Sequence, residues 1–295
     1  MQIFTDLNFQ IKNTAVCIGK FDGLHKGHRL LLQEAKDTGL PVVMITFLFS
    51  EFQGIYSYEE KKTLAELLGV DYFVVIPVTE EFMKMEPETF IKNVLVEKCD
   101  AKKVVVGADF RFGYKRAGNT EILKEKGKHF GFEVTVYEKL TQDGEIISST
   151  RIRKLLSSGK ISEANTLLKT PYFMQGIVES GNQIGRKISV PTANIQPAKE
   201  KELPPFGVYA VRVQSGNKTY NGVGNLGVKP TIPGENPVGM EVWIFDYDGD
   251  LYDKEIIVSL IDFLREERKF ANLEELQKQI AKDTTLAKEI LSQQE

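Results

Sequence analysis

The stretch "TAVCIGKFDGLHKGH" (residues 14–28) says most about how this chain folds. Its first six residues, "TAVCIG" (14–19), form an apolar run typical of a buried strand, and the run ends in glycine. Residues 27–37 then carry apolar side chains on one side at helical spacing. The sequence therefore predicts a buried strand that turns through a glycine-rich loop into a helix.

The same alternation continues through the first half of the chain. Further β-type runs lie at 41–47, 72–78, 102–107 and 132–138. Helical patterns lie between them at 58–68, 87–97 and 120–130, and two short helical stretches follow, to about residue 169. Strands that alternate with helices predict an α/β, Rossmann-like domain whose parallel sheet carries helices on both faces.

The pattern changes from Pro171 onward. Strand-like runs follow one another through turns rich in glycine and proline, with no helical pattern between them. Such a series predicts a small antiparallel β-barrel, and residues 273–292 predict a terminal helix. We therefore expect two domains, residues 1–169 and residues 170–295.

Composition and charge narrow the classes of function. The chain has 295 residues, of which 42% are apolar, and a net charge of −3. No global basic field would recruit nucleic acid or an anionic membrane, so local groups must hold any anionic ligand. Cys17 and Cys99 lie far apart, which indicates neither a disulfide framework nor a cysteine metal site and suits the cytoplasm. We find no signal-peptide pattern and no apolar run of membrane-spanning length.

Two of the three histidines, His25 and His28, lie in the predicted turn among Gly19, Gly23 and Gly27. A strand that turns through glycine into a helix exposes backbone N–H groups and a positive helix end, which together bind phosphate. Two imidazoles there can donate hydrogen bonds to phosphate oxygens. No neighbouring carboxylate cluster or third histidine supports a zinc site. The alternative is a glycine-rich loop with two surface histidines, but the paired spacing favours a function.

Two later stretches add polar groups to the first half. The run "VVVGADFRFGYKRAGN" (104–119) leaves a strand for a charged loop, which by itself indicates only a solvated loop. The run "ISSTRIRKLL" (147–156) combines hydroxyls and guanidinium groups at a predicted helix start, which is either an anion site or simple capping with exposed arginines. The residues concerned are Ser148, Ser149, Thr150, Arg151 and Arg153.

The second half contains no P-loop, so any phosphoryl transfer there is of another kind. In "GRKISVPTAN" (185–194), the Thr192 hydroxyl and the Asn194 carbonyl lie two residues apart on an extended segment and point the same way. Both are oxygen ligands that Mg²⁺ accepts alongside ATP phosphates and water. Taken alone, this short motif is a weak signal and favours a simple turn.

Together these stretches resemble the prokaryotic bifunctional riboflavin kinase/FMN adenylyltransferase family, also called FAD synthetase. The run G-x-F-D-G-x-H-x-G-H is similar to the HxGH signature of nucleotidyltransferases, and "FGVYAV" (206–211), "GVGNLGVKPT" (222–231) and "FLREERKF" (263–270) follow in the family's order. The resemblance covers nearly the whole chain. It implies phosphorylation of riboflavin to FMN by ATP with Mg²⁺, then adenylylation of FMN to FAD with release of pyrophosphate. It implies these small molecules as partners, and no nucleic acid or membrane.

The resemblance also implies which residues form the two sites. The catalytic residues would be His25, His28, Arg153 and Glu241. The ATP-binding residues would be Gly19, Phe21, Asp22, Gly23, Gly27, Ser149, Thr150, Gly185 and Arg186. The flavin-binding residues would be Asp109, Phe110, Arg265 and Glu267, and the metal ligands Thr192 and Asn194. Glu241 would take the proton from the ribityl 5′-hydroxyl, although its strand pattern is also compatible with an outward-facing structural residue.

The chain departs from the family at several positions. Many relatives carry T-F-x-P-H-P after the second strand, where this chain has "TFLFSEF" (46–52), without the histidine and both prolines. Ser189, Trp243 and Asp253 also replace residues usual in the second domain. The first departure favours an alternative, a riboflavin kinase whose adenylyltransferase domain is impaired. A flavin storage protein is disfavoured because storage needs no general base, and a different nucleotidyltransferase is disfavoured by the kinase-like second half.

Overall fold

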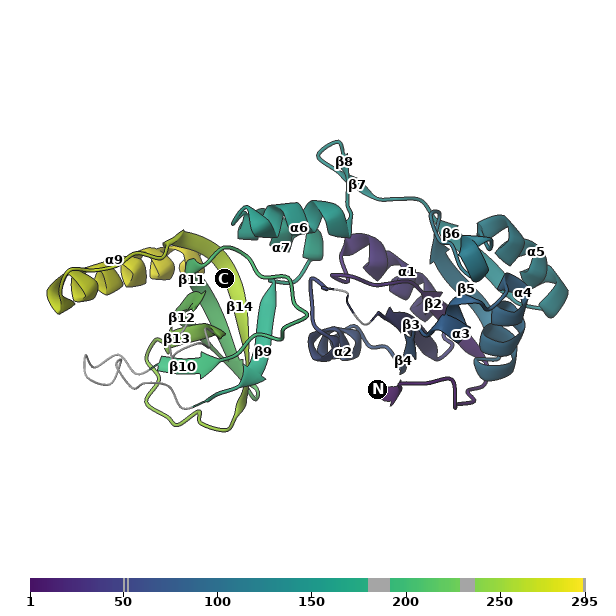
Figure 1. Ribbon diagram of the computed structural model, residues 1–295, viewed down its shortest axis with the longest axis horizontal. Helices are drawn as coiled ribbons and strands as arrows, with labels where there is room; N and C mark the ends of the chain where they lie inside the picture. The colour runs from purple at the N-terminus through teal and green to yellow at the C-terminus, as the bar shows by residue number, and fades with distance from the viewer. Residues whose placement is uncertain (50, 52, 180–191, 229–236, 294–295) are drawn as a thin grey trace. The chain divides into compact units, whose positions relative to one another are not determined.

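The computed structural model describes residues 1–49, 51, 53–179, 192–228 and 237–293. The chain divides into two compact units, Met1–Ser149 and Thr150–Glu295, and each has its own apolar core (Figure 1). Across the described ranges, no helix is long and apolar enough to cross a membrane.

A six-stranded parallel sheet forms the centre of the first unit, in the order β1-β4-β3-β2-β5-β6. The strands are β1 (Gln2–Phe4), β2 (Thr14–Ile18), β3 (Val42–Leu48), β4 (Tyr72–Pro77), β5 (Ala101–Gly107) and β6 (Glu133–Tyr137). The chain builds outward from β2 to β3 and β4, then returns to β5 on the other side of β2. The carboxyl ends of β2 and β5 therefore form the topological switch point, where open α/β sheets bind ligands.

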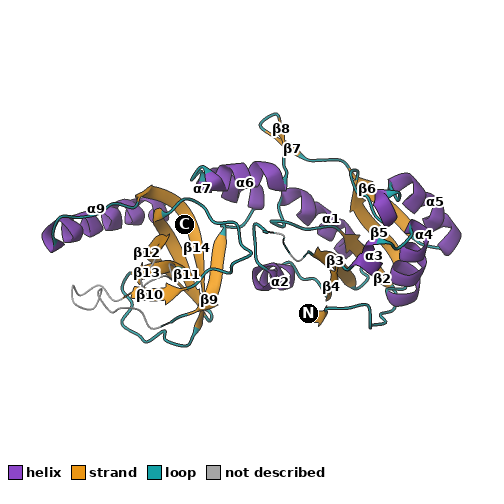
Figure 2. Cartoon of the chain, viewed as in Figure 1, coloured by secondary structure: helices purple, strands orange, loops and turns teal. Residues whose placement is uncertain are grey.

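Helices lie on both faces of this sheet (Figure 2). They are α1 (Lys26–Asp37), α2 (Tyr58–Leu67), α3 (Glu80–Met83), α4 (Pro87–Phe90), the π-helical η1 (Ile91–Lys98), the 3₁₀ turn η2 (Tyr114–Arg116) and α5 (Thr120–Phe130). Cys17 of β2 donates to the Leu31 carbonyl of α1 at 3.2 Å, whereas Val16 and Ile18 share a core with η1. Neighbouring strand residues point to opposite faces, so α1 and η1 cover opposite sides. This confirms the predicted α/β class.

Most predicted elements of the first unit are confirmed to within one residue at each end. The unit also contains small elements that the sequence patterns did not predict: β1, α3, η2 and a two-stranded hairpin of β7 (Thr141–Gln142) and β8 (Glu145–Ile146). The helix predicted at 87–97 is also present, but most of it is π-helical.

The second unit contains an antiparallel sheet in the order β10-β13-β12-β11-β14-β9. The strands are β9 (Phe173–Ile177), β10 (Thr192–Ile195), β11 (Gly207–Ser215), β12 (Lys218–Val228), β13 (Val238–Ile244) and β14 (Glu255–Glu266). The sheet curls until its two edges approach, because Glu179, just after β9, forms an antiparallel bridge with Asn194 of β10. The predicted small barrel is thus confirmed as a curled half-barrel.

The terminal helix α9 (Leu273–Ser292) lies along one face of this sheet, as predicted. Ala287 and Leu291 of α9 pack with Ala210 of β11, with Phe245 just after β13, and with Ile261 of β14. Each of these five side chains is buried. This small cluster fixes the C-terminal half of α9.

The division between the units differs from the boundary expected near residue 170. Helices α6 (Ser149–Ser157) and α7 (Ile161–Leu168) fall almost entirely in the second unit. Asn165 of α7 explains part of this, because its amide donates to the Leu260 carbonyl at 2.9 Å and accepts from the Tyr172 N–H at 2.7 Å. These two bonds join α7 to β14 and to the start of β9.

Two fragments measure how much α6 and α7 contribute, one of residues 150–295 and one of residues 170–295. We expect the longer fragment to be more stable by about 3 kcal/mol or more, because α7 alone buries four apolar side chains. Urea unfolding followed by circular dichroism measures the difference. Equal stability of the two fragments would show that these helices are not part of the second domain's core.

Candidate functional site

The turn between β2 and α1 has an unusual backbone. Phe21 and Leu24 have φ angles of 47° and 44°, and Gly23 has a φ of 85°. The left-handed region costs a non-glycine residue roughly 1–2 kcal/mol. Phe21 and Leu24 are both fully buried, so their packing offsets this cost. Backbone strain of this kind is concentrated at functional sites in proteins.

Four hydrogen bonds hold the turn in place. The Thr46 hydroxyl donates to the Lys20 carbonyl at 3.0 Å. The Asp22 carboxylate accepts from the Ile55 N–H at 2.8 Å, and the Asp22 carbonyl accepts from the Ser149 hydroxyl at 2.9 Å. The Lys61 ammonium also donates to the Lys20 carbonyl, at 3.1 Å. Asp22 and Ser149, both predicted as ATP contacts, therefore also anchor the turn.

The two histidines stack on each other at the start of α1. The ring centroids of His25 and His28 are 3.7 Å apart with an interplanar angle of 17°, and the Phe21 ring meets His28 edge-on at 5.3 Å. A Cβ at Gly27 would lie 3.2 Å from the His25 ring, so this position favours glycine. The Nδ1 atoms of both histidines are buried and have no hydrogen-bond partner among the described residues. Such atoms are rare in folded proteins outside functional sites.

Burial keeps both imidazoles neutral. It lowers the pKa of His25 to about 4, although the nearby Asp22 carboxylate acts in the opposite direction. Burial also lowers the pKa of His28 well below its ordinary value, and the adjacent His25 ring and the Lys61 ammonium add to this effect. A neutral imidazole offers one N–H donor and one acceptor. The pair can therefore donate hydrogen bonds to an anion without first gaining protons.

The predicted flavin contacts of the first unit lie just after β5, at the same edge of the sheet as the histidine turn. Asp109 forms an exposed ion pair with Lys139 at 2.9 Å. The Phe110 ring stacks on Phe112, with centroids 5.3 Å apart. Phe112 belongs to the apolar core of the first unit and Phe110 packs against that core, so this stack also stabilises the fold.

The "TFLFSEF" segment continues β3 toward that edge. Phe47 packs against Phe82 with ring centroids 5.9 Å apart, and the Lys20 ammonium lies 4.9 Å from the centre of the Phe49 ring. Ser50 and Phe52 lie outside the described residues. Phe49 thus stands where relatives carry the first proline of this motif, and Glu51 stands where they carry the second.

Helix α6 begins at Ser149, as its capping residues predict. Thr150 is exposed, whereas the Arg153 guanidinium forms an ion pair with the Glu202 carboxylate. About a quarter of each of these two charged side chains is exposed. The sequence gives no sign of this pairing, because the two residues lie far apart along the chain.

A row of polar side chains crosses three neighbouring strands of the second unit. Glu241 of β13 lies directly opposite Asn194 of β10 on one side and Asn225 of β12 on the other. Residues directly opposite each other in an antiparallel pair point to the same face. The Thr192 hydroxyl donates to the Glu241 carboxylate at 2.6 Å. The half-buried Glu241 is therefore surrounded by groups that can share a ligand.

These oxygen atoms fit the requirements of Mg²⁺. The Thr192 hydroxyl oxygen keeps lone pairs for a cation while its hydrogen points at Glu241, and Asn194 offers an amide oxygen on the same face. No group of three or more histidine, cysteine, aspartate or glutamate residues in the described part of the chain could hold a metal ion alone. Mg²⁺ commonly binds through few protein ligands, with phosphates and water completing its shell.

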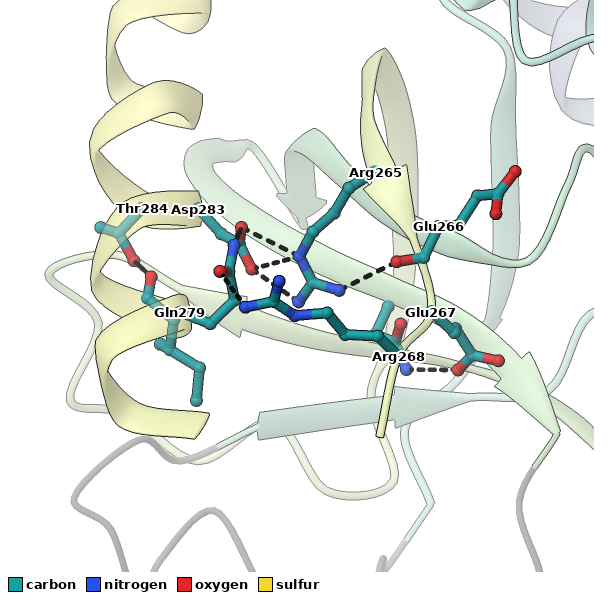
Figure 3. Close-up of polar contacts among 9 residues, drawn as sticks. Arg265, Glu266, Glu267, Arg268, Gln279, Asp283 and Thr284 are labelled. Atoms are coloured by element: carbon teal, nitrogen blue, oxygen red, sulfur yellow. Dashed lines mark hydrogen bonds and ion pairs between the residues drawn. The ribbon is translucent and has the colours of Figure 1, made fainter. Parts of the chain in front are cut away.

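The predicted flavin contacts of the second unit already have protein partners. Arg265 of β14 forms a bidentate ion pair with Asp283 of α9 (Figure 3). Glu267 accepts a hydrogen bond from the Asn225 amide at 3.0 Å. A Cβ at Gly227 would lie only 2.0 Å from Glu267, so this glycine leaves room for the carboxylate. Gly185 and Arg186, predicted to bind ATP, lie outside the described residues.

Sequence reasoning did not single out Lys61, Asn225 or Asp283. Lys61 and Asp283 lie on helices among other charged residues, where nothing local distinguishes them. Asn225 lies within a recognised run, but only the register of β12 against β13 places it beside Glu241. Each of the three is revealed by a long-range contact.

The chain is similar to named proteins over almost its whole length. The family described as FAD synthetase matches residues 8–151, and the family described as riboflavin kinase matches residues 168–291. The bifunctional riboflavin kinase/FMN adenylyltransferase of Escherichia coli (strain K12) is 37% identical over 286 residues, which cover 92% of this chain and 91% of that protein. The protein of the same name from Listeria monocytogenes serovar 1/2a is 34% identical, with 92% and 90% covered.

A solved structure has the same fold. It is a crystal structure described as a macrolide-efflux protein from Streptococcus pneumoniae, with a TM-score of 0.85 and 28% identity. The match covers 97% of this chain and 98% of that chain. It supports the succession of an α/β unit, an antiparallel half-barrel and a terminal helix.

The neutral state of the histidine pair can be measured by NMR. We expect the His25 ring to titrate near pH 4 and the His28 ring far below its ordinary range. The unfolded chain takes up these protons near pH 6.5, so it binds more protons than the folded chain between about pH 6.5 and pH 4. Stability should therefore fall as the pH drops through this window. A ¹H–¹³C pH series, assigned with His25→Gln and His28→Gln, gives the midpoints, and a midpoint near 6.5 for either ring would contradict the prediction.

Proposed function

The chain belongs to the bifunctional riboflavin kinase/FMN adenylyltransferase family, and we propose that its histidine turn and its Glu241 row are the two active sites. The observation that carries this proposal is the separation of the two constellations. The stacked histidines lie within the region that matches FAD synthetase, and Glu241 lies within the region that matches riboflavin kinase. We propose riboflavin, FMN and ATP as the substrates and the cytoplasm as the location.

In the first domain, FMN attacks ATP at its α-phosphorus. A bond forms between an FMN phosphate oxygen and this phosphorus, the bond to the β-phosphate breaks, and pyrophosphate leaves. The N–H groups of His25 and His28 donate to the α-phosphate as its charge develops, with the start of α1 and Gly19, Gly23 and Gly27 beside it.

Further groups in this proposal come from the start of α6 and the loop after β5. Ser149 and Thr150 contribute hydroxyls toward ATP, and Asp109 and Phe110 contact the flavin. For Arg153 to act on phosphate, the phosphate must replace Glu202 on its guanidinium. Binding of ATP would therefore include the release of Glu202 from Arg153.

In the second domain, riboflavin attacks ATP at its γ-phosphorus. The ribityl 5′-hydroxyl oxygen forms the new bond, ADP leaves, and Glu241 accepts the hydroxyl proton. Thr192 and Asn194 would hold Mg²⁺, which neutralises charge on the ATP phosphates when bound. The hydrogen bond from Thr192 keeps the Glu241 carboxylate in place between the metal ligands and the flavin.

We also propose that the kinase domain starts near residue 170. Thr192, Asn194 and Glu241 all lie beyond this point, and the region that matches riboflavin kinase begins at residue 168. Helices α6 and α7 would then serve as a connection that packs onto the kinase core without supplying catalytic groups to it.

The first prediction from this scheme concerns His28. We expect His28→Ala to lower FAD formation from FMN by on the order of a hundredfold, because one donor to the developing charge is lost. The rate of FMN formation from riboflavin should stay within twofold of that of the unchanged protein, because the scheme places this reaction at a separate site. Chromatographic separation of FMN and FAD measures both activities.

The exposed His129 of α5 gives the matched control. His129→Ala should leave both activities unchanged. Equal loss of both activities in His28→Ala would reject the two-site scheme. Absence of FAD from the unchanged protein, with normal FMN formation, would instead favour a monofunctional kinase and point to the "TFLFSEF" departure.

The second prediction concerns Glu241. The change Glu241→Gln keeps the size of the side chain and removes the base, so riboflavin phosphorylation should fall by on the order of a hundredfold or more. Adenylylation of supplied FMN should persist. Glu255→Gln, an exposed residue of β14 that pairs with Gln175, is the matched control. Normal kinase turnover in Glu241→Gln would show that another group accepts the proton.

A further inference from the structure

Helix α9 carries one buried carboxylate, Asp283, at the start of its buried stripe. Its buried residues are Asp283, Ala287 and Leu291, and no residue of α9 before Asp283 is buried. Only 7% of the Asp283 side chain is exposed. A charge so deeply buried is costly unless it is paired and hydrogen-bonded.

Both oxygens of this carboxylate are engaged (Figure 3). Nε of Arg265 lies 3.1 Å from Oδ1 and 3.0 Å from Oδ2, and Nη2 lies 2.8 Å from Oδ2. Gln279, one turn earlier in α9, donates to Oδ1 at 2.6 Å. Arg268 donates to the Gln279 amide oxygen in turn. Asp283 thus occupies the centre of a connected network between α9 and the end of β14.

The ion pair fixes one side of the Arg265 guanidinium and leaves the other side available. Nε and one N–H of Nη2 bind Asp283, and one N–H of Nη1 binds the Glu266 carbonyl at 3.0 Å. A guanidinium has five N–H groups. One N–H on each of Nη1 and Nη2 therefore has no acceptor among the described residues. We call these two N–H groups the free edge of Arg265, and both can donate to a ligand.

The register connects this edge with the proposed kinase site. Arg265 lies opposite Val208 of β11, Val208 lies opposite Asn225 of β12, and Asn225 lies opposite Glu241 of β13. Three steps between neighbouring strands span at most roughly 14 Å. Glu267, two residues after Arg265, accepts from Asn225, so the end of β14 is also tied to the row that contains Glu241.

We propose that Asp283 is a positioning residue for riboflavin binding, which it supports by holding the free edge of Arg265 toward the flavin. This inference rests on the proposed kinase site. An arginine side chain loses much conformational freedom when it binds a ligand. The ion pair with Asp283 removes that freedom before the ligand arrives, so less affinity is lost on binding.

The experiment compares Asp283→Asn with the unchanged full-length protein. Riboflavin affinity is read from the quenching of its fluorescence on titration, and KM and kcat are read from FMN formation. We expect Kd and KM to rise about tenfold, the effect of one weakened charge-assisted hydrogen bond, and kcat to change less than twofold. A merely structural role would lower thermal stability and leave the Kd of the folded protein unchanged, which would overturn the proposal.

A double-mutant cycle tests whether Asp283 acts through Arg265. We expect Arg265→Ala to raise Kd, and Asp283→Asn to add nothing in that background, because the group it positions is gone. Additive losses would overturn the proposal. Glu274→Gln is the matched control, since Glu274 lies on the same helix in an exposed pair with Lys278 and should leave Kd unchanged.

A second variant and a second outcome complete the test. If Asp283→Asn fails to fold by circular dichroism, Gln279→Leu replaces it, because this change removes the Gln279 hydrogen bond to Oδ1 of Asp283 and keeps the ion pair. We then expect Kd to rise about threefold, and an unchanged Kd would overturn the proposal. If the unchanged protein binds riboflavin but forms no FMN, the kinase proposal fails while the Kd values still decide the role of Asp283.

Discussion

The turn between β2 and α1 depends on buried packing that holds two non-glycine residues in left-handed conformations. Phe21 and Leu24 have no exposed surface, and the edge of the Phe21 ring meets His28. Because the backbone is fixed there, the two imidazoles can stack at 3.7 Å at the start of α1. The order of the sheet then brings the loop after β5 to the same edge. Relaxing this turn would separate the histidines and disperse the site.

The two domains differ in how they accommodate buried polar side chains at their proposed sites. The first buries its histidines and keeps them neutral, so no countercharge is needed until phosphate binds. The second domain keeps charged side chains. Asp283 forms an ion pair with Arg265, and Glu241 accepts a hydrogen bond from the Thr192 hydroxyl. Neutral N–H donors can bind a phosphate oxygen through their dipoles and carry no charge that burial would penalise. A carboxylate held by a hydrogen bond, as Glu241 is, stays available as the base of the proposed kinase site.

Local sequence patterns predicted the features that are determined within a few residues of the chain. The strand ending at Gly19, the helix that follows and the HxGH spacing were readable because each is set within a few residues. The pairings Arg153–Glu202 and Arg265–Asp283 and the place of Asn225 were not, because they depend on strand register and on contacts between distant elements. Asp253 lies between these cases. It replaces a usual glycine, and its φ of 60° explains that preference, since aspartate tolerates the left-handed region better than most residues.

The chain's weak net charge of −3 makes these local arrangements matter more. The net charge does not concentrate ATP near the chain, so in the proposed sites its affinity comes from backbone N–H groups, neutral imidazoles and a few oriented cations. Riboflavin is uncharged, and in the proposed kinase site an unpaired Arg265 guanidinium would attract free phosphate as readily as flavin. Pairing Arg265 with Asp283 cancels most of that field and keeps two directed N–H donors. In the proposed kinase site, the ion pair therefore favours recognition by hydrogen-bond geometry over recognition by charge, which suits an uncharged planar substrate.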